Sequence, residues 1–485
     1  MQAALFCFSD WRLDVGGQSE TKFSHPMRPK YVTILSCFVV VTGLLAASLE
    51  TQLNDPYFAR IEPIKAPATS QLLLKKGDRL AIIGDSITEQ KLYSRMIETY
   101  LTVCMPELEI TARQYGWSGE RAPGFLARMT NDCLRFDPTI ATTCYGMNDH
   151  EYKPYEDRIG KTYRETQTAI VDSFKANRVR VVLGSPGPVG KMPSWVKTAT
   201  GTVTDLNENL CKLRNIDIDI AKSERVAFAD VFWPMYVAGF EGQKRFGTNF
   251  MIAGKDGVHP GMAGQTVMAY AFLKAMGLDG DLGTFTVDLR SNKATASKGH
   301  TVSSSVAGEF TFESTRFPFC ATGAADSDGS IRAAMALIPF NEDLNRMTLL
   351  VKNATAPRYS VTWGAESKTF TREQLSKGVN LAAEFATNPF TSAFAKVDNA
   401  VGKKQAYETT QIKTVFHQVL NGQIKSAEDT KDPEIKQLLG IRTPDGKLDV
   451  EGVIQATEIK RGLLAQQIRE AIAPVRHQIK IAPAP

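Results

Sequence analysis

Arg-Leu-Ala-Ile-Ile-Gly-Asp-Ser-Ile-Thr-Glu, at residues 79–89, is the stretch that decides the fold of this chain. Its apolar run Leu80–Ile83 predicts a buried parallel strand, which Gly84-Asp85-Ser86 ends. Apolar residues at helical spacing then predict a helix over Ile87–Val103. Ser86 is therefore expected at a strand-to-helix turn, where open α/β sheets bind ligands and helix N–H groups lack partners.

Strand and helix patterns alternate onward to Leu278. Such alternation predicts an α/β domain with a parallel sheet covered by helices on both faces. The predicted strands are Leu80–Ile83, Glu109–Gln114, Thr139–Cys144, Val179–Leu183 and Val226–Val231.

Two interpretations fit Ser86. Ser and Asp are preferred helix caps, so Asp85-Ser86 by itself fits a simple cap. A second stretch, Asp256-Gly257-Val258-His259-Pro260, favours a nucleophile instead. Within one tight turn, Asp256 can accept from His259 Nδ1–H and leave Nε2 facing a serine hydroxyl. Alone, this stretch also fits a loop that opens the helix predicted at 261–276.

Hydrogen-bond donors are expected at two further strand ends. Gly116-Trp117-Ser118-Gly119-Glu120 follows the second strand, and a glycine there can present its N–H to a substrate. Asn148, after the third strand, has a neutral amide suited to developing negative charge. Each of these alone fits an ordinary turn. Together with Ser86 and His259 they indicate a nucleophilic site with an oxyanion hole.

These four blocks resemble those of the SGNH hydrolases, or GDSL-type esterases. The resemblance rests on Gly84-Asp85-Ser86, Gly119, Gly146-Met147-Asn148-Asp149 and Asp256–Pro260, and it is greatest to secreted bacterial, planctomycete-like members. It implies a flavodoxin-like doubly wound sheet of about five strands. Ile87 replaces the Leu of the family's name. The Gly-x-Ser-x-Gly elbow of the α/β-hydrolases is absent from the sequence.

By this resemblance, Ser86 is the nucleophile, His259 the base and Asp256 the residue that orients it. The oxyanion hole is implied to consist of the Ser86 and Gly119 N–H groups and the Asn148 amide, with Gly116 a less favoured candidate. No metal or organic cofactor is implied. The expected activity is hydrolysis of a short acyl ester, such as an acetyl ester of a carbohydrate. Alternatives are an acyltransferase, a lipase and a non-catalytic secreted binding protein.

Substrate-binding residues are expected in the loops around the four blocks. Aromatic faces beside hydrogen-bonding groups suit a sugar ring better than a fatty chain, although the aromatic residues also fit simple packing. The candidates are Asp85, Tyr115, Trp117 and His150.

Composition limits the partners that can be expected. The chain has 485 residues, 43% hydrophobic content and a formal charge of +5, which indicate a globular protein of several domains. Because basic runs with interleaved aromatics are absent, a nucleic-acid partner is not expected. The 7 Cys have no metal-ligand spacing, although one bridge, Cys104–Cys133, would fit. The sequence predicts no oligomeric state.

The chain divides into four predicted regions. Residues 1–50 resemble a leader with a signal peptide, because Arg28 and Lys30 precede an apolar run that ends in Ala46-Ala47-Ser48. Export is expected, with an uncleaved membrane anchor as the alternative; no other membrane association is expected. The catalytic domain is predicted at 51–282, a small antiparallel β-rich module at 283–371 and a helical region at 372–485.

Overall fold

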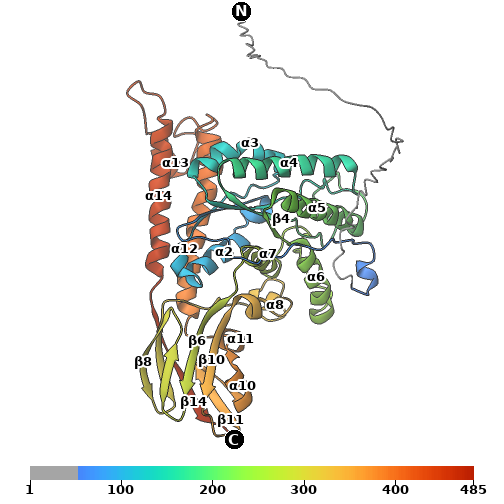
Figure 1. Cartoon of the computed structure of the whole chain (residues 1–485). Coiled ribbons are helices and arrows are strands. Elements are labelled where there is room, and N and C mark those ends of the chain that lie inside the picture. Colours follow the sequence, from blue (N-terminus) through green and yellow to red (C-terminus); the bar gives the residue numbers. More distant parts are fainter. Residues whose placement is uncertain (1–52) are drawn as a thin grey trace, which may run out of the picture. The chain divides into compact units, whose positions relative to one another are not determined.

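Figure 1 shows the structure of the whole chain. Five parallel strands form one of its sheets, in the order β2-β1-β3-β4-β5. This order is that of a flavodoxin-like doubly wound sheet, and it confirms the predicted fold class. The computed structural model describes residues 53–485, so the predicted leader at 1–50 lies outside the described residues. The strands are β1 (Arg79–Gly84), β2 (Thr111–Gln114), β3 (Ile140–Cys144), β4 (Arg180–Gly184) and β5 (Ala227–Ala229).

Helices cover both faces of this sheet. Successive side chains of a strand point to opposite faces, so one strand can contribute to two separate cores. Leu80 and Ile82 of β1 belong to one buried core, whereas Ala81 and Ile83 belong to the other. Among the described residues, no helix is both long and apolar enough to span a bilayer. The helices are α1 (Ser86–Glu89), α2 (Tyr93–Val103), α3 (Ala122–Asp132), α4 (Asp157–Ala176), α5 (Val203–Glu224), α6 (Phe232–Phe246) and α7 (Met262–Ala275).

Two helices of this domain differ from the sequence prediction. The helix expected over Ile87–Val103 is interrupted between α1 and α2, where Lys91 adopts a left-handed φ of 58°. Helix α6 was not predicted. Only Asp230 and Val231 separate it from β5, so the apolar residues of the strand and of the helix form a nearly continuous run.

The region after Gly280 holds two further sheets, ordered β13-β10-β6-β7 and β12-β11-β14-β9-β8. Their strands are β6 (Asp281–Asp288), β7 (Lys293–Ala296), β8 (His300–Val306), β9 (Glu309–Ser314), β10 (Arg346–Lys352), β11 (Arg358–Trp363), β12 (Glu366–Thr371), β13 (Val379–Asn380) and β14 (Val475–Pro483). Four short helices accompany them: α8 (Ile331–Met335), α9 (Phe340–Leu344), α10 (Arg372–Lys377) and α11 (Leu381–Glu384).

Three expectations for this region need correction. The module is not purely antiparallel, because β6 and β10 pair in parallel. Within the predicted β-rich module, the sequence pattern of Arg332–Ile338 predicts a strand, but residues 331–335 form helix α8 instead. This helix is capped by Ser330 and is rich in alanine, a strong helix former. Finally, the range 372–485 is not helical throughout, because β14 returns from the C-terminal helices to pair with β9 and β11.

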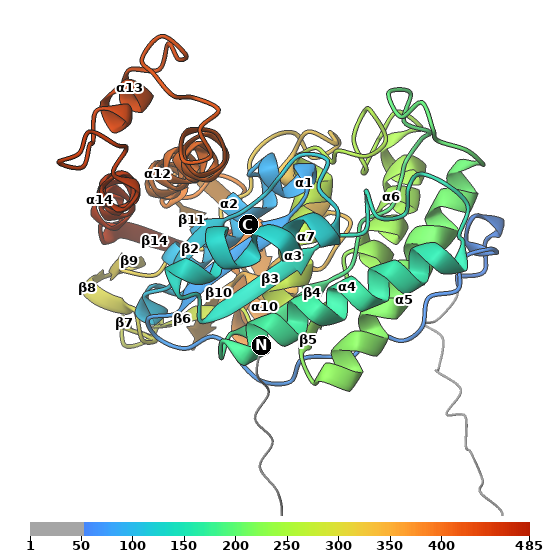
Figure 2. The same cartoon turned by 90° about the horizontal axis from the view of Figure 1, so that it is seen from above.

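The C-terminal helices cover the open edge of the catalytic sheet at β2 (Figure 2). They are α12 (Thr391–Thr409), a π-helix η4 (Thr410–Val419), α13 (Pro433–Leu439) and α14 (Val450–Ala471). The buried residues of α12 join one core of the domain, and those of η4 join the other. The continuous α12–η4 segment therefore passes around the sheet edge. Apolar residues at helical spacing from Ile412 to Leu420 predict one buried face. Its residues Ile412, Val415, Phe416 and Val419 are buried, and Leu420 is partly buried.

The described cysteines form no disulfide. Cys104 and Cys133, the pair for which a bridge was considered, are both free and buried, as are Cys144, Cys211 and Cys320. Burial raises the pKa of the Cys133 thiol to about 12. These cysteines therefore act as small apolar side chains.

A chain of hydrogen bonds connects two buried histidines of the β-rich region. Trp363 Nε1–H donates to His477 Nδ1 at 3.1 Å, and His477 Nε2 lies 2.9 Å from Ser314 Oγ. Ser314 Oγ lies 2.7 Å from His300 Nδ1, and His300 Nε2 lies 2.9 Å from the Leu282 carbonyl. Because indole only donates, His477 Nδ1 accepts and His477 Nε2–H donates to Ser314 Oγ. Ser314 then donates to His300 Nδ1, and His300 Nε2–H donates to the carbonyl, so both imidazoles are neutral.

We expect this chain to make the protein less stable in acid. Burial, together with the smaller effect of the neighbouring His300, lowers the pKa of His477 to about 3. Between this value and the unfolded value of about 6.5, the unfolded state binds more protons, so stability falls as pH falls through that window. At pH 5 the loss from His477 is about 2 kcal/mol, calculated from those two pKa values.

The measurement is urea unfolding of the wild type and His477→Gln at pH 7 and pH 5. Buried carboxyls with raised pKa values, such as Asp85 and Asp149, change stability in the opposite direction, but they are common to both proteins and cancel. The wild type should lose about 2 kcal/mol more than the variant on acidification. Equal losses in the two proteins would contradict the prediction.

Candidate active site

The nucleophile candidate Ser86 is the first residue of α1, directly beyond the end of β1. Asp85 caps this helix, because its Oδ1 accepts from Ile87 N–H at 2.9 Å. Gly84 is required at the strand end, since a Cβ there would lie 2.2 Å from Thr88 Oγ1 and 2.8 Å from the Cys144 carbonyl. As the first helical residue, Ser86 has an N–H without an intrahelical partner.

His259 connects Ser86 to Asp256 through two hydrogen bonds. His259 Nε2 lies 2.8 Å from Ser86 Oγ, and Nδ1 lies 2.7 Å from Asp256 Oδ2. A carboxylate can only accept, so Nδ1 carries the proton and Nε2 accepts from the serine hydroxyl. The structure thus brings together the three residues that the sequence placed in a triad.

The turn that carries His259 is closed by Asp256 itself. Its Oδ1 accepts from the N–H groups of Val258 at 2.9 Å and His259 at 2.8 Å. Burial alone would raise the pKa of this carboxyl, but these hydrogen bonds and the His259 ring outweigh burial and leave the pKa lowered. Asp256 therefore stays ionised and can stabilise an imidazolium.

Asn148 lies next to the Ser86 turn with its amide orientation fixed. Tyr152 OH donates to Oδ1 at 3.1 Å, and Nδ2 donates to the Glu120 carbonyl at 3.0 Å. Nδ2 also lies 3.5 Å from Asp85 Oδ2, a weak contact that a stronger acceptor can replace. The amide can therefore offer its second N–H to an oxyanion.

The second donor predicted from the sequence is placed by a turn after β2. Gly119 adopts a φ of 75°, the left-handed region that favours glycine, and its N–H has no hydrogen-bond partner among residues 53–485. The competing candidate Gly116 is engaged elsewhere, because its N–H donates to Gln114 Oε1 at 2.9 Å. A Cβ at Gly116 would also overlap the Glu89 backbone, so this glycine allows the turn to pack on α1.

Asp149 joins the two turns that carry these donors. Its Oδ2 accepts from Gly146 N–H and its Oδ1 from Ala122 N–H, both at 2.9 Å. Burial raises the pKa of the Asp149 carboxyl to about 6 in spite of these bonds. Asp149 thus connects the Asn148 turn to the N-terminus of α3.

Three of the four expected substrate-binding residues are buried, and substrate contact by the fourth, Trp117, stays a prediction. Tyr115 is 2% exposed and His150 is 0% exposed, so neither ring can contact a sugar. Asp85 is buried as the cap of α1, and burial raises its pKa to about 7. Trp117 is partly buried with its ring edge-on to His417, 4.7 Å between centroids. Polar and aromatic residue types near a motif did not reveal which way each side chain points.

Trp195 was missed by the sequence reasoning. It lies in the loop between β4 and α5, is 44% exposed and stacks on the His259 ring, with centroids 5.8 Å apart and planes at 28°. The one available signal was an aromatic residue in the long Gly/Pro-rich segment after the fourth strand. Among the described residues, no group of three or more His, Cys, Asp or Glu is arranged to hold a metal ion.

Comparisons with known proteins found one matching family profile and several similar solved structures. Residues 82–267 match the profile of the GDSL-like lipase/acylhydrolase family. No curated protein matches the chain in sequence. The solved structure of a gut microbial diltiazem-metabolizing enzyme is similar over 87% of this chain and 100% of its own, with a TM-score of 0.65 and 22% identity. At this identity the likeness shows the fold, including the regions that follow the catalytic domain.

A second similar structure covers the catalytic domain. It is a mutant of Axe2, an acetylxylan esterase from Geobacillus stearothermophilus, with 22% identity and a TM-score of 0.34 over 42% of this chain and 97% of that one. The family profile matches residues 82–267, so the catalytic domain is similar to the GDSL-like lipase/acylhydrolase (SGNH) family, and the chain is a hydrolase of carboxylic ester bonds.

Proposed function

We propose that this protein removes short acyl groups, above all acetyl, from carbohydrates. The observation that carries the catalytic part is the continuous Asp256–His259–Ser86 hydrogen-bond chain at the end of β1. In this proposal three donors, the N–H groups of Ser86 and Gly119 and the Asn148 amide, bind the carbonyl oxygen of an ester held beside Ser86 Oγ.

The reaction follows from this geometry. Ser86 Oγ attacks the ester carbonyl while His259 Nε2 takes its proton, and the tetrahedral oxyanion accepts hydrogen bonds from the three donors. His259 then gives the proton to the leaving alcohol as the C–O bond breaks, which leaves an acyl-enzyme. Water, deprotonated by His259, attacks the acyl carbon, and the carboxylic acid leaves with Ser86 restored.

A sugar substrate is supported by Trp195. Because Trp195 is exposed and stacks on the His259 ring, its indole lies next to the position of the leaving alcohol, where a sugar ring would be. The loop that follows Asn148 carries Glu151, which pairs with Arg121, half exposed, and with Arg158. This polar rim favours a hydrated substrate over an acyl chain at a lipid interface.

We expect kcat/KM to fall with acyl length in the series p-nitrophenyl acetate, butyrate and octanoate. The value for the acetate should exceed that for the octanoate by about tenfold or more, because the proposed site binds the sugar part of the substrate and not a long acyl chain.

Trp195→Ala should raise KM for an acetylated oligosaccharide by about tenfold, because the indole that contacts the sugar is lost. The matched control is p-nitrophenyl acetate, which lacks a sugar and should keep its KM.

Specificity that rises with acyl length would contradict the proposal and favour a lipase. Products analysed with and without an added acceptor alcohol separate hydrolysis from acyl transfer.

We also propose export through the leader at 1–50. The test is whether the mature protein begins after Ala46-Ala47-Ser48.

A further inference from the structure

Lys413 of the π-helix η4 reaches the helix that carries the nucleophile. Its Nζ lies 2.9 Å from Oε1 and 3.1 Å from Oε2 of Glu89, the last residue of α1. Both side chains are largely shielded from water, with 27% and 19% exposure. π-Helices are rare and occur frequently at functional sites. The Lys413–Glu89 contact is therefore a candidate for a functional role as well as an ion pair.

Glu89 in turn holds the turn that carries Gly119. Its Oε2 accepts from Ser118 N–H at 2.5 Å, one residue before the free N–H of Gly119. A Cβ at Gly119 would meet nothing within 4 Å, so glycine is needed there for its left-handed backbone rather than for space. A residue with such conformational freedom must be held by its neighbours if its N–H is to point at one place.

The same π-helix holds the residue before Ser118. Lys413 Nζ lies 5.0 Å from the centroid of the Trp117 ring, and His417, one turn further on, meets that ring edge-on. His417 is itself fixed, because its Nε2 lies 2.7 Å from Asp132 Oδ2. Lys413 therefore touches the turn at two points, through Glu89 and through Trp117.

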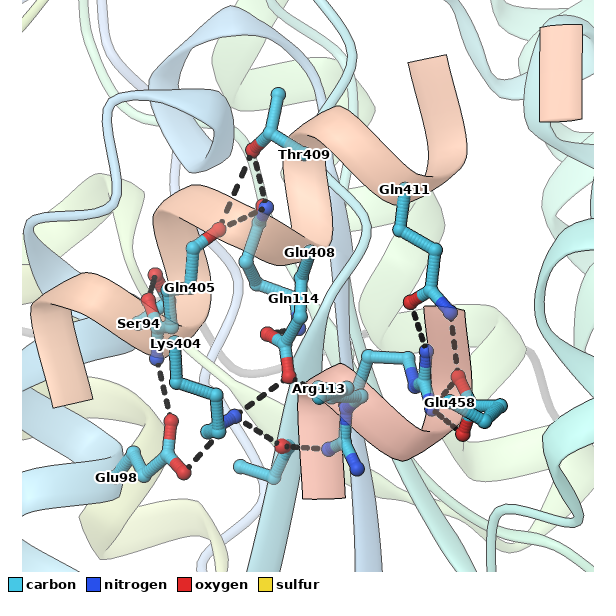
Figure 3. A network of polar contacts seen from close by, with 12 residues as sticks. Ser94, Glu98, Arg113, Gln114, Lys404, Gln405, Glu408, Thr409, Gln411 and Glu458 are labelled. Carbon is cyan, nitrogen blue, oxygen red and sulfur yellow. Dashed lines mark hydrogen bonds and ion pairs between the residues drawn. The ribbon is translucent and has the colours of Figure 1, made fainter. Parts of the chain in front are cut away.

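A buried polar network anchors the continuous α12–η4 segment to the edge strand β2, which leads into the turn that carries Gly119 (Figure 3). Lys404 Nζ donates to the Ala112 carbonyl of β2 at 2.7 Å and to Glu408 at 2.6 Å, while Glu408 accepts from Gln114 N–H at 3.1 Å. Side chains of α12 thus replace a neighbouring strand for β2. One turn later, Gln411 Oε1 accepts from Arg113 at 2.6 Å, which fixes η4 at the same edge.

We propose that Lys413 is a positioning residue for the oxyanion hole of this enzyme, an inference that rests on the proposed function. By holding and neutralising Glu89, it keeps the Ser118–Gly119 peptide in place. It also prevents an unpaired carboxylate on α1 from opposing the negative charge that develops near Ser86. The C-terminal region, distant in sequence, thereby becomes part of the catalytic apparatus.

The test compares Lys413→Met with Lys413→Arg and with the control Lys460→Met. Lys460 makes the same two kinds of contact, an ion pair with Glu434 and a position 4.5 Å over the Tyr407 ring, but it does not touch the turn. Lys413→Met should lower kcat for p-nitrophenyl acetate about tenfold with KM unchanged. Lys413→Arg should recover most of this loss, and Lys460→Met should leave kcat and KM at the wild-type values.

Two further measurements separate this role from a structural one. In a Glu89→Gln background, Lys413→Met should change kcat less than twofold, because its partner charge is already gone. Amide hydrogen exchange of the peptide that contains Ser118 and Gly119 should become faster in Lys413→Met and not in Lys460→Met. The exchange result does not require esterase activity, so it tests Lys413 even if the wild type fails to hydrolyse the ester and the proposed function is wrong.

Three results would overturn the proposal. They are a wild-type kcat in Lys413→Met, an equally large loss in the Glu89→Gln background, and unchanged exchange of the Ser118–Gly119 peptide.

Discussion

Replacing Ser86 with alanine is expected to lower kcat by on the order of 10⁴–10⁶, the largest effect of any single change in this protein. The hydroxyl is the atom that forms the acyl-enzyme, and no other hydroxyl is hydrogen-bonded to His259 among the described residues. The folded state should be unaffected, because Ser86 is the first residue of α1 and its helix cap is Asp85. The measurements are hydrolysis of p-nitrophenyl acetate and labelling by a fluorophosphonate with peptide mapping.

Ser194 provides the matched control, because it is an exposed serine next to Trp195 in the loop over His259. Ser194→Ala should keep both activity and labelling, whereas Ser86→Ala should lose both. The double variant Ser86→Ala/His259→Ala should be no slower than Ser86→Ala, since the two residues act as one unit. Equal labelling of the wild type and Ser86→Ala would show that another residue is the nucleophile.

Asn148→Ala is expected to lower kcat by on the order of 10²–10³ with little change in KM. The reason is that the Nδ2 group facing Asp85 at 3.5 Å makes only a weak bond in the free enzyme and gains a strong one only when the oxyanion forms. Tyr152→Phe should cause a smaller loss, because it removes the hydroxyl that orients the amide but keeps the amide itself.

The control for this change is Asn177→Ala, at the exposed C-terminus of α4, where the amide only caps a helix. It should leave kcat unchanged. Thermal unfolding of each variant excludes a general loss of structure, since Asn148 also donates to the Glu120 carbonyl. A kcat for Asn148→Ala within about threefold of wild type would remove this residue from the oxyanion hole.

Local patterns were sufficient for the catalytic sheet. The predicted strands differ from β1–β5 by a few residues at their ends, and the doubly wound order of the strands was implied by the family resemblance. The candidate site was also accessible, because Ser86, Asn148 and His259 each follow a strand or precede a helix, and such positions converge at one edge of a parallel sheet.

Elements whose partners are distant in sequence were predicted less well. Strand β14 completes a sheet with β9 and β11 although more than one hundred residues separate it from either. Local periodicity could not indicate this pairing, and the final residues therefore read as a continuation of the helices. The predicted division into 51–282, 283–371 and 372–485 remains a prediction, with β14 reassigned to the β-rich region.

The sequence by itself determined which groups could react, because a nucleophile, its base and the hole donors lie in short motifs whose geometry is set within a few residues. Only the tertiary structure decided what surrounds them. It placed Trp195 over His259, buried Tyr115 and His150, and brought Lys413 to Glu89 across 324 residues of chain. Such contacts depend on how whole elements pack, and the spacing of residues along the chain does not encode that packing.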